Sequence, residues 1–352
     1  MKIKLAILEK DKSYLNRIAT AFGSKYADKF EIYSFTDQNT AMDHLDAARI
    51  DVLLASDCFD INVGLLPNRC GFAYLVDSAD IDSLKDQRAI CKFQKADLIY
   101  KQVLMVYSEN VGRIGFKVDG DSGKIIAFTS VSGGVGASTM AAACALHFAA
   151  RGSKVLYLNL EKYGSADLFF QGQGQFDMSD VIFALKSKKA NLHIKLEGCV
   201  KQDPRGVHFF SQSKFALDMM ELHTEEILRL LTELNMGSEY DFIILDMDFA
   251  LDADTMKIFR ESHAIVLVGN GTVESNLKTE RAYTALTTLE SGADVPLMSR
   301  MSFLYNKVSS KDGKTLNAPT LRVLGGAPVY THSDDAQLLA QLQHMDAFDK
   351  IL

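Results

Sequence analysis

Residues 124–139 read KIIAFTSVSGGVGAST, an apolar run followed by a glycine-rich turn. The run 124–129 predicts a buried strand, and residues 139–151 predict a helix that Gly152 ends. In a turn between a strand and a helix, glycines let backbone N–H groups approach a phosphate, and the helix dipole adds favourable potential. The stretch therefore indicates a phosphate-binding loop, with a simple tight turn as the alternative.

The loop departs from the strict phosphate-loop pattern GxxxxGK[ST] at two positions. Val131 stands where that pattern has its first glycine, and Ala137 stands where it has its lysine. Ser138 opens the helix, where its hydroxyl is expected to hold a magnesium ion.

On both sides of this stretch, apolar runs of strand length alternate with helical runs. The other expected strands are 3–8, 30–35, 51–55, 73–76, 98–100, 155–158, 242–245, 264–268 and 302–305, and the N-terminal helices are 13–23 and 39–48. This alternation favours parallel pairing and an α/β fold. Polar, glycine-containing sequence after residue 107 predicts a linker, which gives a domain at 1–108, a linker at 109–122 and a domain at 123–352.

Composition excludes several classes of protein. The formal net charge of -7 gives no general attraction for nucleic acid or anionic membranes, so no stable nucleic-acid binding is expected. The sequence contains no apolar window of 18 or more residues, so no integral membrane segment is expected. The five cysteines are scattered and lack a CxxC pair, which indicates reduced thiols in a cytoplasmic protein and neither disulfides nor a zinc site.

Residues 132–139 (SGGVGAST) resemble the deviant Walker A loop of the MinD/ParA ATPases, KGGxGK[ST]T, with Ser132 and Ala137 in place of its two lysines. The resemblance implies a P-loop domain with a mostly parallel sheet that binds ATP and Mg²⁺. It also implies a homodimer that forms face to face through the ATP-binding side, in which Ser132 replaces the lysine that reaches across the dimer.

Further motifs of that family follow in order. Residues 155–161 resemble its VLLIDLD strand and place Glu161 at the catalytic position, near magnesium or the attacking water. Residues 240–246 resemble the Walker B strand, so that Asp246 and Ser138 are the implied metal ligands. Residues 304–307 resemble the NR/NK element that holds adenine, and 326–330 resemble the loop that closes over the base. The residues implied to bind the nucleotide are Gly133, Gly134, Val135, Gly136, Ala137, Ser138, Thr139, Asn306, Lys307 and Pro328.

Each of these residues also has a purely structural interpretation. Asp246 is also compatible with a turn at a strand end, Glu161 with exposed charge after a strand, and Asn306 with a local cap. If the site is functional, the missing lysines remove cations from around the γ-phosphate, where they stabilise phosphoryl transfer. We therefore expect ATP binding with weak hydrolysis, unless a lysine such as Lys162 substitutes.

The order of elements in residues 1–108 resembles a receiver domain with the flavodoxin-like α/β sandwich. Lys10 interrupts the usual acidic pair, and Ser56 stands at the position of the phosphate-accepting aspartate. Lys101 lies near the expected lysine, although Gln102 replaces the proline that follows it. The resemblance implies an atypical, unphosphorylated docking module. A one-residue shift that makes Asp57 the acceptor, or ordinary surface charges, are the alternatives.

The two parts together resemble the TadZ/CpaE proteins of tight-adherence pilus assembly. This implies a cytoplasmic, ATP-bound dimeric scaffold, at the inner face of the membrane at a cell pole, which recruits pilus assembly proteins through its N-terminal domain. The alternatives are an active partitioning or positioning ATPase that cycles on DNA or membrane, and a transcriptional regulator. Lysines in 186–189 are the best candidates for a nucleic-acid contact, and the acidic C-terminal helix is expected to pack on its own domain.

Overall fold

The computed structural model describes residues 2–110, 123–164, 166–187, 192–236, 240–291, 296–309, 314–318, 320–331 and 334–352. The chain forms two compact units. The N-terminal unit combines the first part of the chain with residues 187–199, and the C-terminal unit holds the rest. Most of the segment predicted to be a linker, residues 111–122, lies outside the described residues.

The N-terminal unit is built on a sheet with strand order β2-β1-β3-β4-β6-β5, parallel except for the β5–β6 pair. Its elements are β1 (Ile3–Leu8), α1 (Lys12–Lys25), β2 (Phe30–Phe35), α2 (Gln38–Ala47), β3 (Val52–Ser56), η1 (Val63–Leu65), β4 (Gly71–Val76), β5 (Ser83–Leu84), β6 (Gln87–Cys91) and α3 (Ala96–Asn110). Asp11 and Asp37 cap the first two helices, since their carboxylates accept backbone N–H groups of the first turn.

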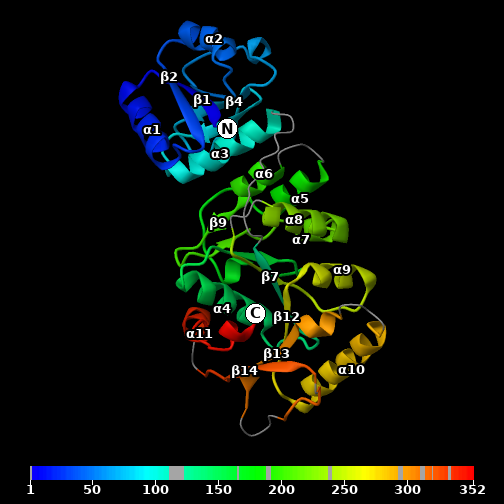
Figure 1. Cartoon of the computed structure of the whole chain (residues 1–352). Helices are drawn as coiled ribbons and strands as arrows, with labels where there is room; N and C mark the ends of the chain where they lie inside the picture. The colour runs from blue at the N-terminus through cyan, green and yellow to red at the C-terminus, as the bar shows by residue number, and fades with distance from the viewer. Residues whose placement is uncertain are drawn as a thin grey trace. The chain divides into compact units, whose positions relative to one another are not determined.

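Successive side chains of the central strands point to opposite faces of the sheet, so the unit has two hydrophobic cores. Leu5 and Ile7 point to one face and pack with residues of α1 and α3, whereas Ala6 and Leu8 point to the other and pack with residues of α2. Figure 1 shows α1 and α3 on one side of this sheet and α2 on the other. Because both faces are covered, the strands read as continuous apolar runs.

Helix α6 (Leu192–Cys199) belongs to the N-terminal unit although it lies far along the chain. Its Ile194 is part of the core that contains α1 and α3. The Tyr100 hydroxyl of α3 donates to Glu197 Oε1 at 2.5 Å, and Lys29 lies 3.8 Å from the same carboxylate. A Cβ at Gly198 would lie 3.3 Å from the Lys101 carbonyl, so glycine permits close packing of α6 on α3.

The C-terminal unit is built on an eight-stranded sheet with order β14-β13-β12-β7-β11-β8-β10-β9, parallel except for the β9–β10 pair. Its strands are β7 (Lys124–Thr129), β8 (Val155–Asn159), β9 (Lys201–Gln202), β10 (His208–Phe209), β11 (Phe242–Asp246), β12 (Ala264–Gly269), β13 (Met301–Val308) and β14 (Arg322–Pro328). Its helices are α4 (Ala137–Ala150), η2 (Ala166–Leu168), α5 (Met178–Lys186), α7 (Ala216–Met220), α8 (Thr224–Met236), α9 (Ala253–Glu261), α10 (Val273–Leu289), η3 (Leu297–Arg300), α11 (Asp335–Leu342) and η4 (Phe348–Lys350).

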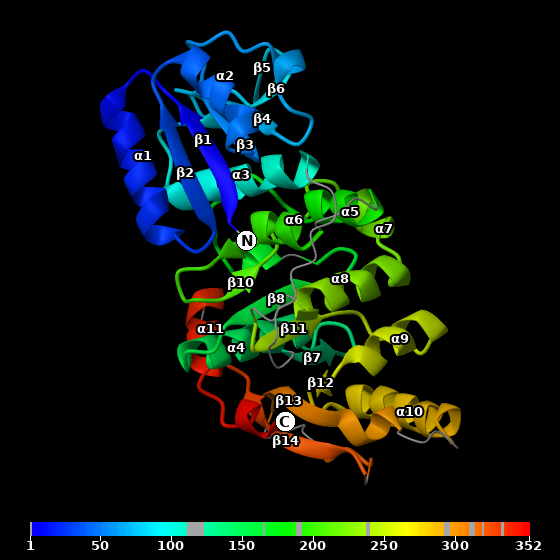
Figure 2. The ribbon, with the colours of Figure 1, turned by 45° about the horizontal axis from the view of Figure 1, so that its top comes forward.

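Helix α4 lies on one side of this sheet together with α11, and α8, α9 and α10 lie on the other (Figure 2). The α4 residues 140–147 are all buried. Leu339, Leu342 and Phe348 share the core with α4, which confirms that the C-terminal helix packs on its own domain. His147, fully buried on α4, fixes this segment through Nε2, which lies 2.9 Å from Asp349 Oδ1.

Two elements differ from the sequence-based prediction. Leu98, Ile99 and Tyr100 belong to helix α3, so the strand predicted at 98–100 is wrong. The next strand of the sheet after β4 is β6, whose polar start at Gln87 and Arg88 does not read as a buried strand. Residues 326–328, expected in a loop over the base, are the end of strand β14. A three-residue apolar run fits a helix face as well as a strand, which explains the first error.

Candidate functional site: the glycine loop and its carboxylates

The glycine-rich turn joins the end of β7 to the start of α4. Gly134 and Gly136 have φ of 75° and 87°, a region that side chains strain to adopt. Gly133 and Gly134 are exposed, and a Cβ on either would meet no atom within 4 Å. The backbone of the loop therefore lies open to a ligand at the N-terminus of a 14-residue helix, which favours an anion.

Residues at the end of β13 hold the loop from behind. Asn306, which is 3% exposed, donates its Nδ2 to the carbonyl of Val135 at 2.9 Å. Lys307 donates its Nζ to the carbonyl of Gly134 at 3.1 Å, and its own φ is 54°. A Cβ on Gly136 would lie 2.5 Å from Asn306 Nδ2, so only glycine fits there. The structure thus brings Asn306 and Lys307 to the carbonyls of the loop, and a contact of either residue with adenine stays a prediction.

The two positions that lack lysine hold small side chains. Ser132 is buried, and its Oγ has no hydrogen-bond partner among the described residues. Its backbone is tied by Ser130, whose hydroxyl donates to the Ser132 carbonyl at 2.6 Å and accepts the Ser132 N–H at 3.0 Å. Ala137 is the first residue of α4. Lys162 is exposed, and Lys307 is the lysine that contacts the loop backbone in the described part of the chain.

Three polar side chains predicted to act on the metal and the attacking water converge at the carboxyl ends of the strands. Ser138, in the first turn of α4, donates its hydroxyl to Glu161 Oε2 at 3.3 Å. Asp246, the last residue of β11, is 1% exposed. The parallel register places Asn159 of β8 directly opposite Asp246. Ligand sites of open α/β sheets lie at this edge.

Two donors hold one oxygen of Asp246. The Tyr157 hydroxyl donates to Asp246 Oδ2 at 2.6 Å, and Asn159 Nδ2 donates to the same oxygen at 2.8 Å. Asn159 also contacts Glu161, since its Oδ1 accepts the Glu161 N–H at 3.1 Å. Sequence reasoning gave no role to Tyr157. The alternation of strand 155–159 was the available signal, because it puts 157 and 159 on one face.

The pKa of Asp246 departs strongly from the usual value of a carboxyl group. Burial and the neighbouring charge of Glu161 raise the pKa of Asp246 to about 7, while the hydrogen bond from Tyr157 acts in the opposite direction. Asp246 Oδ1 is buried and accepts no hydrogen bond from the described residues. A buried carboxylate with an open oxygen, beside a second carboxylate and a hydroxyl, fits a divalent cation.

The donor set fits magnesium in particular. No group of three or more histidine, cysteine or acidic side chains among the described residues is arranged to hold a metal by itself. Mg²⁺ typically takes one or two carboxylates and completes its shell with water and phosphate oxygens. Asp246 and Ser138 would hold it, and it would supply positive charge beside the loop.

Pro328, which the resemblance implies to bind the nucleotide, has no described contact with the glycine loop. Pro328 ends strand β14, where it pairs in register with Val308, and its side chain is exposed. Thr139 lies in the first turn of α4, half-buried. The structure thus places the loop, Glu161, Asp246, Asn306 and Lys307 around one edge of the sheet.

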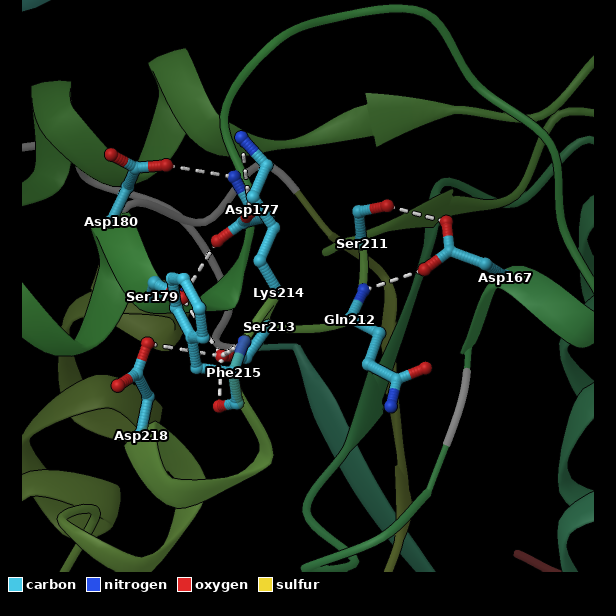
Figure 3. Close-up of polar contacts among 10 residues, drawn as sticks. All are labelled: Asp167, Asp177, Ser179, Asp180, Ser211, Gln212, Ser213, Lys214, Phe215 and Asp218. Atoms are coloured by element: carbon cyan, nitrogen blue, oxygen red, sulfur yellow. Dashed lines mark hydrogen bonds and ion pairs between the residues drawn. The ribbon is translucent and has the colours of Figure 1, made fainter.

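The chain that follows Glu161 is fixed by a polar network (Figure 3). Asp167 of η2 accepts hydrogen bonds from the Ser211 hydroxyl and, at 2.6 Å, from the Gln212 N–H. The hydroxyls of Ser179 and Ser213 lie 2.8 Å apart, which ties the first turn of α5 to the segment that follows β10. These contacts hold η2, α5 and residues 211–215 together.

The N-terminal unit has an ionic centre around Lys92, in which Glu9 is buried and Asp77 is exposed. Lys92, directly after β6, lies 3.1 Å from Glu9 Oε2 and 3.0 Å from Asp77 Oδ1, and it donates to Ser56 Oγ at 3.1 Å. Although burial acts to lower the pKa of Lys92, hydrogen bonds to Asp77 and Glu9 raise it above its usual value. Lys92, which the sequence analysis did not single out, is therefore a lysine that contacts Ser56.

The other charges predicted for a receiver pocket have structural roles. Asp11 caps α1, and Lys101 belongs to α3. Gln102, also on α3, accepts a hydrogen bond from Gln94 at 2.7 Å. The sequence missed Lys92 because it assigned the last strand of the sheet to residues 98–100.

Comparisons with known proteins agree with this architecture. Residues 1–108 match the family model of the TadZ-like receiver domain, and residues 123–273 match that of an AAA domain. No curated protein matches the chain.

Several solved structures resemble the chain at low sequence identity. A ParA family ATPase from Chlorobium tepidum is 17% identical, with a TM-score of 0.48, over 66% of this chain and 96% of that one. The septum site-determining protein MinD from Pyrococcus horikoshii, complexed with Mg-ADP, is 18% identical, with a TM-score of 0.48, over 62% and 94%. MinC:MinD from Aquifex aeolicus is 16% identical, with a TM-score of 0.44, over 62% and 85%. By its family models, the chain thus combines a match to a TadZ-like receiver domain with a match to an AAA domain.

Proposed function

We propose that the protein is an ATP- and Mg²⁺-binding dimeric scaffold of a tight-adherence pilus assembly system, with weak ATP hydrolysis. The observation that carries the proposal is the combination of an open glycine loop with Ser138, Glu161 and Asp246 beside it, and with no lysine in the loop itself. Backbone N–H groups and a cation suffice to bind triphosphate in the ground state. Transition-state charge on the transferred phosphoryl group lacks the loop lysines that would stabilise it.

The retained Glu161 supports a second candidate, an active partitioning or positioning ATPase. Glu161 Oε2 lies 3.3 Å from Ser138 Oγ, close enough to act on a water near a bound metal. Against DNA as a partner, Lys186 is paired with Glu221 at 2.6 Å. Lys188 and Lys189 lie outside the described residues. No helix in the described part of the chain has the length and apolarity to cross a membrane.

A titration with ATP and Mg²⁺ tests the proposal. Light scattering measures the molecular mass, and a phosphate assay measures the phosphate released. We expect ATP-dependent dimers with little phosphate released. Ala137→Lys is expected to raise phosphate release at least tenfold, since it restores a cation in the loop. Ala150→Lys, the same change at an exposed position of α4, is the control. Fast release by the unmodified protein would support the ATPase, and the absence of any ATP effect would refute both.

The dimer is supported by large apolar side chains that follow Glu161. Tyr163 and Leu168 are 80% and 71% exposed, and Phe215, held in the network of Figure 3, is 69% exposed. Such exposed apolar groups mark protein–protein contacts when they gather. Leu168→Glu is expected to abolish the ATP-dependent increase in mass and to leave binding of a fluorescent ATP analogue unchanged. Retention of the dimer in this variant would refute the assignment of the interface.

Recruitment of pilus proteins through the N-terminal domain is supported by the Lys92 centre. Lys92 pairs with the buried carboxylate of Glu9 and with the exposed carboxylate of Asp77, so Glu9 has its counter-charge within the unit. Next to it, Phe93 is 69% exposed. We expect Phe93→Ser to prevent polar recruitment of pilus assembly proteins in cells while ATP-dependent dimerisation persists. Unchanged recruitment would refute this role for the surface around Phe93.

A further inference from the structure

The two oxygens of the Asp246 carboxylate have different surroundings. Its Oδ2 accepts from Tyr157 at 2.6 Å and from Asn159 at 2.8 Å, whereas its Oδ1 is buried and accepts no hydrogen bond from the described residues. The two donors come from alternate positions of one strand, β8, and Asn159 lies opposite Asp246 in the sheet register. The strand geometry therefore fixes both donors on the same oxygen.

Both donors are suited to hold an ionised carboxylate. Tyr157 is fully buried, and its phenol hydroxyl donates to Asp246 Oδ2 at 2.6 Å. Asn159 has a side chain that cannot ionise, and it also donates to Glu161 Oε2 at 3.3 Å. A carboxylate oxygen that already accepts two strong hydrogen bonds is a poor metal ligand, and the free oxygen is the better one.

The loop after Glu161 keeps Asn159 in this position. The Asn159 Oδ1 accepts the Glu161 N–H at 3.1 Å. A Cβ on Gly164 would lie 2.1 Å from the same oxygen, so the loop packs against the amide as closely as glycine allows. The amide is thus oriented from both sides, with its Nδ2 toward Asp246.

We infer that Tyr157 and Asn159 are positioning residues, which hold Asp246 so that only its Oδ1 faces the cation of the nucleotide. The inference rests on the proposed ATP and Mg²⁺ site and adds the residues that set its metal geometry. Donors to a metal-binding carboxylate typically account for a 10- to 100-fold difference in metal affinity. Tyr157 and Asn159 therefore set metal affinity without contact to the metal or the nucleotide.

The test is a titration of the full chain with Mn²⁺, followed by the electron paramagnetic resonance signal of the free ion. One arm uses the metal alone and a second adds a non-hydrolysable ATP analogue. Tyr157→Phe removes only the hydroxyl and is expected to weaken Mn²⁺ binding at least tenfold in any arm where the unmodified protein binds the metal. Asn159→Ala is expected to weaken it to a similar degree. Tyr33→Phe, the same change at a tyrosine of the N-terminal unit, is the control.

A purely structural role is distinguished by the unfolding temperature, measured on the same variants. If Tyr157→Phe and Asn159→Ala lower that temperature and leave Mn²⁺ affinity as in Tyr33→Phe, the inference is overturned. If the unmodified protein binds Mn²⁺ and no ATP analogue, the proposed function fails and the metal-only arm still decides the inference. If it binds no Mn²⁺ in either arm, the inference is overturned as well.

Discussion

The side-chain amide of Asn306 donates to the backbone carbonyl of Val135 at 2.9 Å, across 171 positions of sequence. This contact joins the end of β13 to the glycine loop, with Asn306 almost completely buried. Because a carbonyl in the loop is satisfied by a side chain, the loop has a defined conformation before any ligand arrives. Such preorganisation reduces the entropy lost on binding.

Replacing Asn306 by alanine is expected to lower the free energy of unfolding by about 1–3 kcal/mol, because a buried carbonyl loses its partner. Affinity for an ATP analogue should fall as well, since the loop is no longer held. Urea denaturation and analogue titration measure the two effects. Asn317→Ala, at an exposed position of the same unit, should change neither. Equal stability of the two variants would contradict the role of Asn306.

Gly136→Ala tests the shape of the loop. The backbone at Gly136 has a φ of 87°, and the new Cβ would lie 2.5 Å from Asn306 Nδ2. We expect a loss of at least about 1 kcal/mol from the backbone strain alone. Gly133→Ala is the matched comparison, because a Cβ there meets no atom within 4 Å, and its stability should change by less than about 0.5 kcal/mol. Thermal and urea unfolding of both proteins provide the measurement.

Lys92→Met is expected to destabilise the N-terminal unit by about 3–5 kcal/mol, because it leaves the buried carboxylate of Glu9 without its cation. The double variant Lys92→Met with Glu9→Gln should recover much of that loss. A double-mutant cycle followed by urea denaturation gives the coupling between the two residues. Lys95→Met, at a nearby exposed position, serves as the control. Additive effects in the cycle would refute the pairing.

His263 makes stability depend on pH at the start of β7. Its Nδ1 accepts the Ile125 N–H at 3.0 Å, and burial, with Arg300 and Lys124 nearby, lowers its pKa below the usual value. The unfolded chain therefore binds the proton first as pH falls below about 6.5, so this contribution is present above that pH and is lost as pH falls through the folded-state pKa.

Unfolding curves at pH 7.5 and 5.5 check the expectation. His263→Asn keeps an acceptor and removes the titration, so its stability should fall less between the two pH values than that of the unmodified protein. His223→Asn, the same change at an exposed position, should behave like the unmodified protein. An identical pH dependence in all three proteins would exclude His263 as the source.

The strands of the site could be predicted because they are long and buried. Residues 124–129 form β7 as predicted, and 155–158 and 242–245 form most of β8 and β11. Their order around the glycine turn is enough to place Asp246 and Glu161 at one sheet edge. The positions of the loop and of the two carboxylates in the fold could therefore be predicted from the sequence.

Contacts that depend on side-chain direction across the sheet could not be predicted in the same way. The hydrogen bond from Tyr157 to Asp246 requires the register of β8 on β11, which the sequence does not display. Lys92 was missed for a related reason, because the polar start of β6 hid the strand that carries it. Short polar strands at a sheet edge lie below what hydrophobic periodicity detects.

The place of α6 in the N-terminal unit sets an order for folding during synthesis. Helix α3 finds part of its packing surface, including Ile194 and Glu197, only in residues 192–199. A ribosome that has released the first 110 residues has therefore not yet supplied the whole unit. Part of α3 therefore stays uncovered on the nascent N-terminal unit until α6 has been synthesised, after β7, α4, β8 and α5.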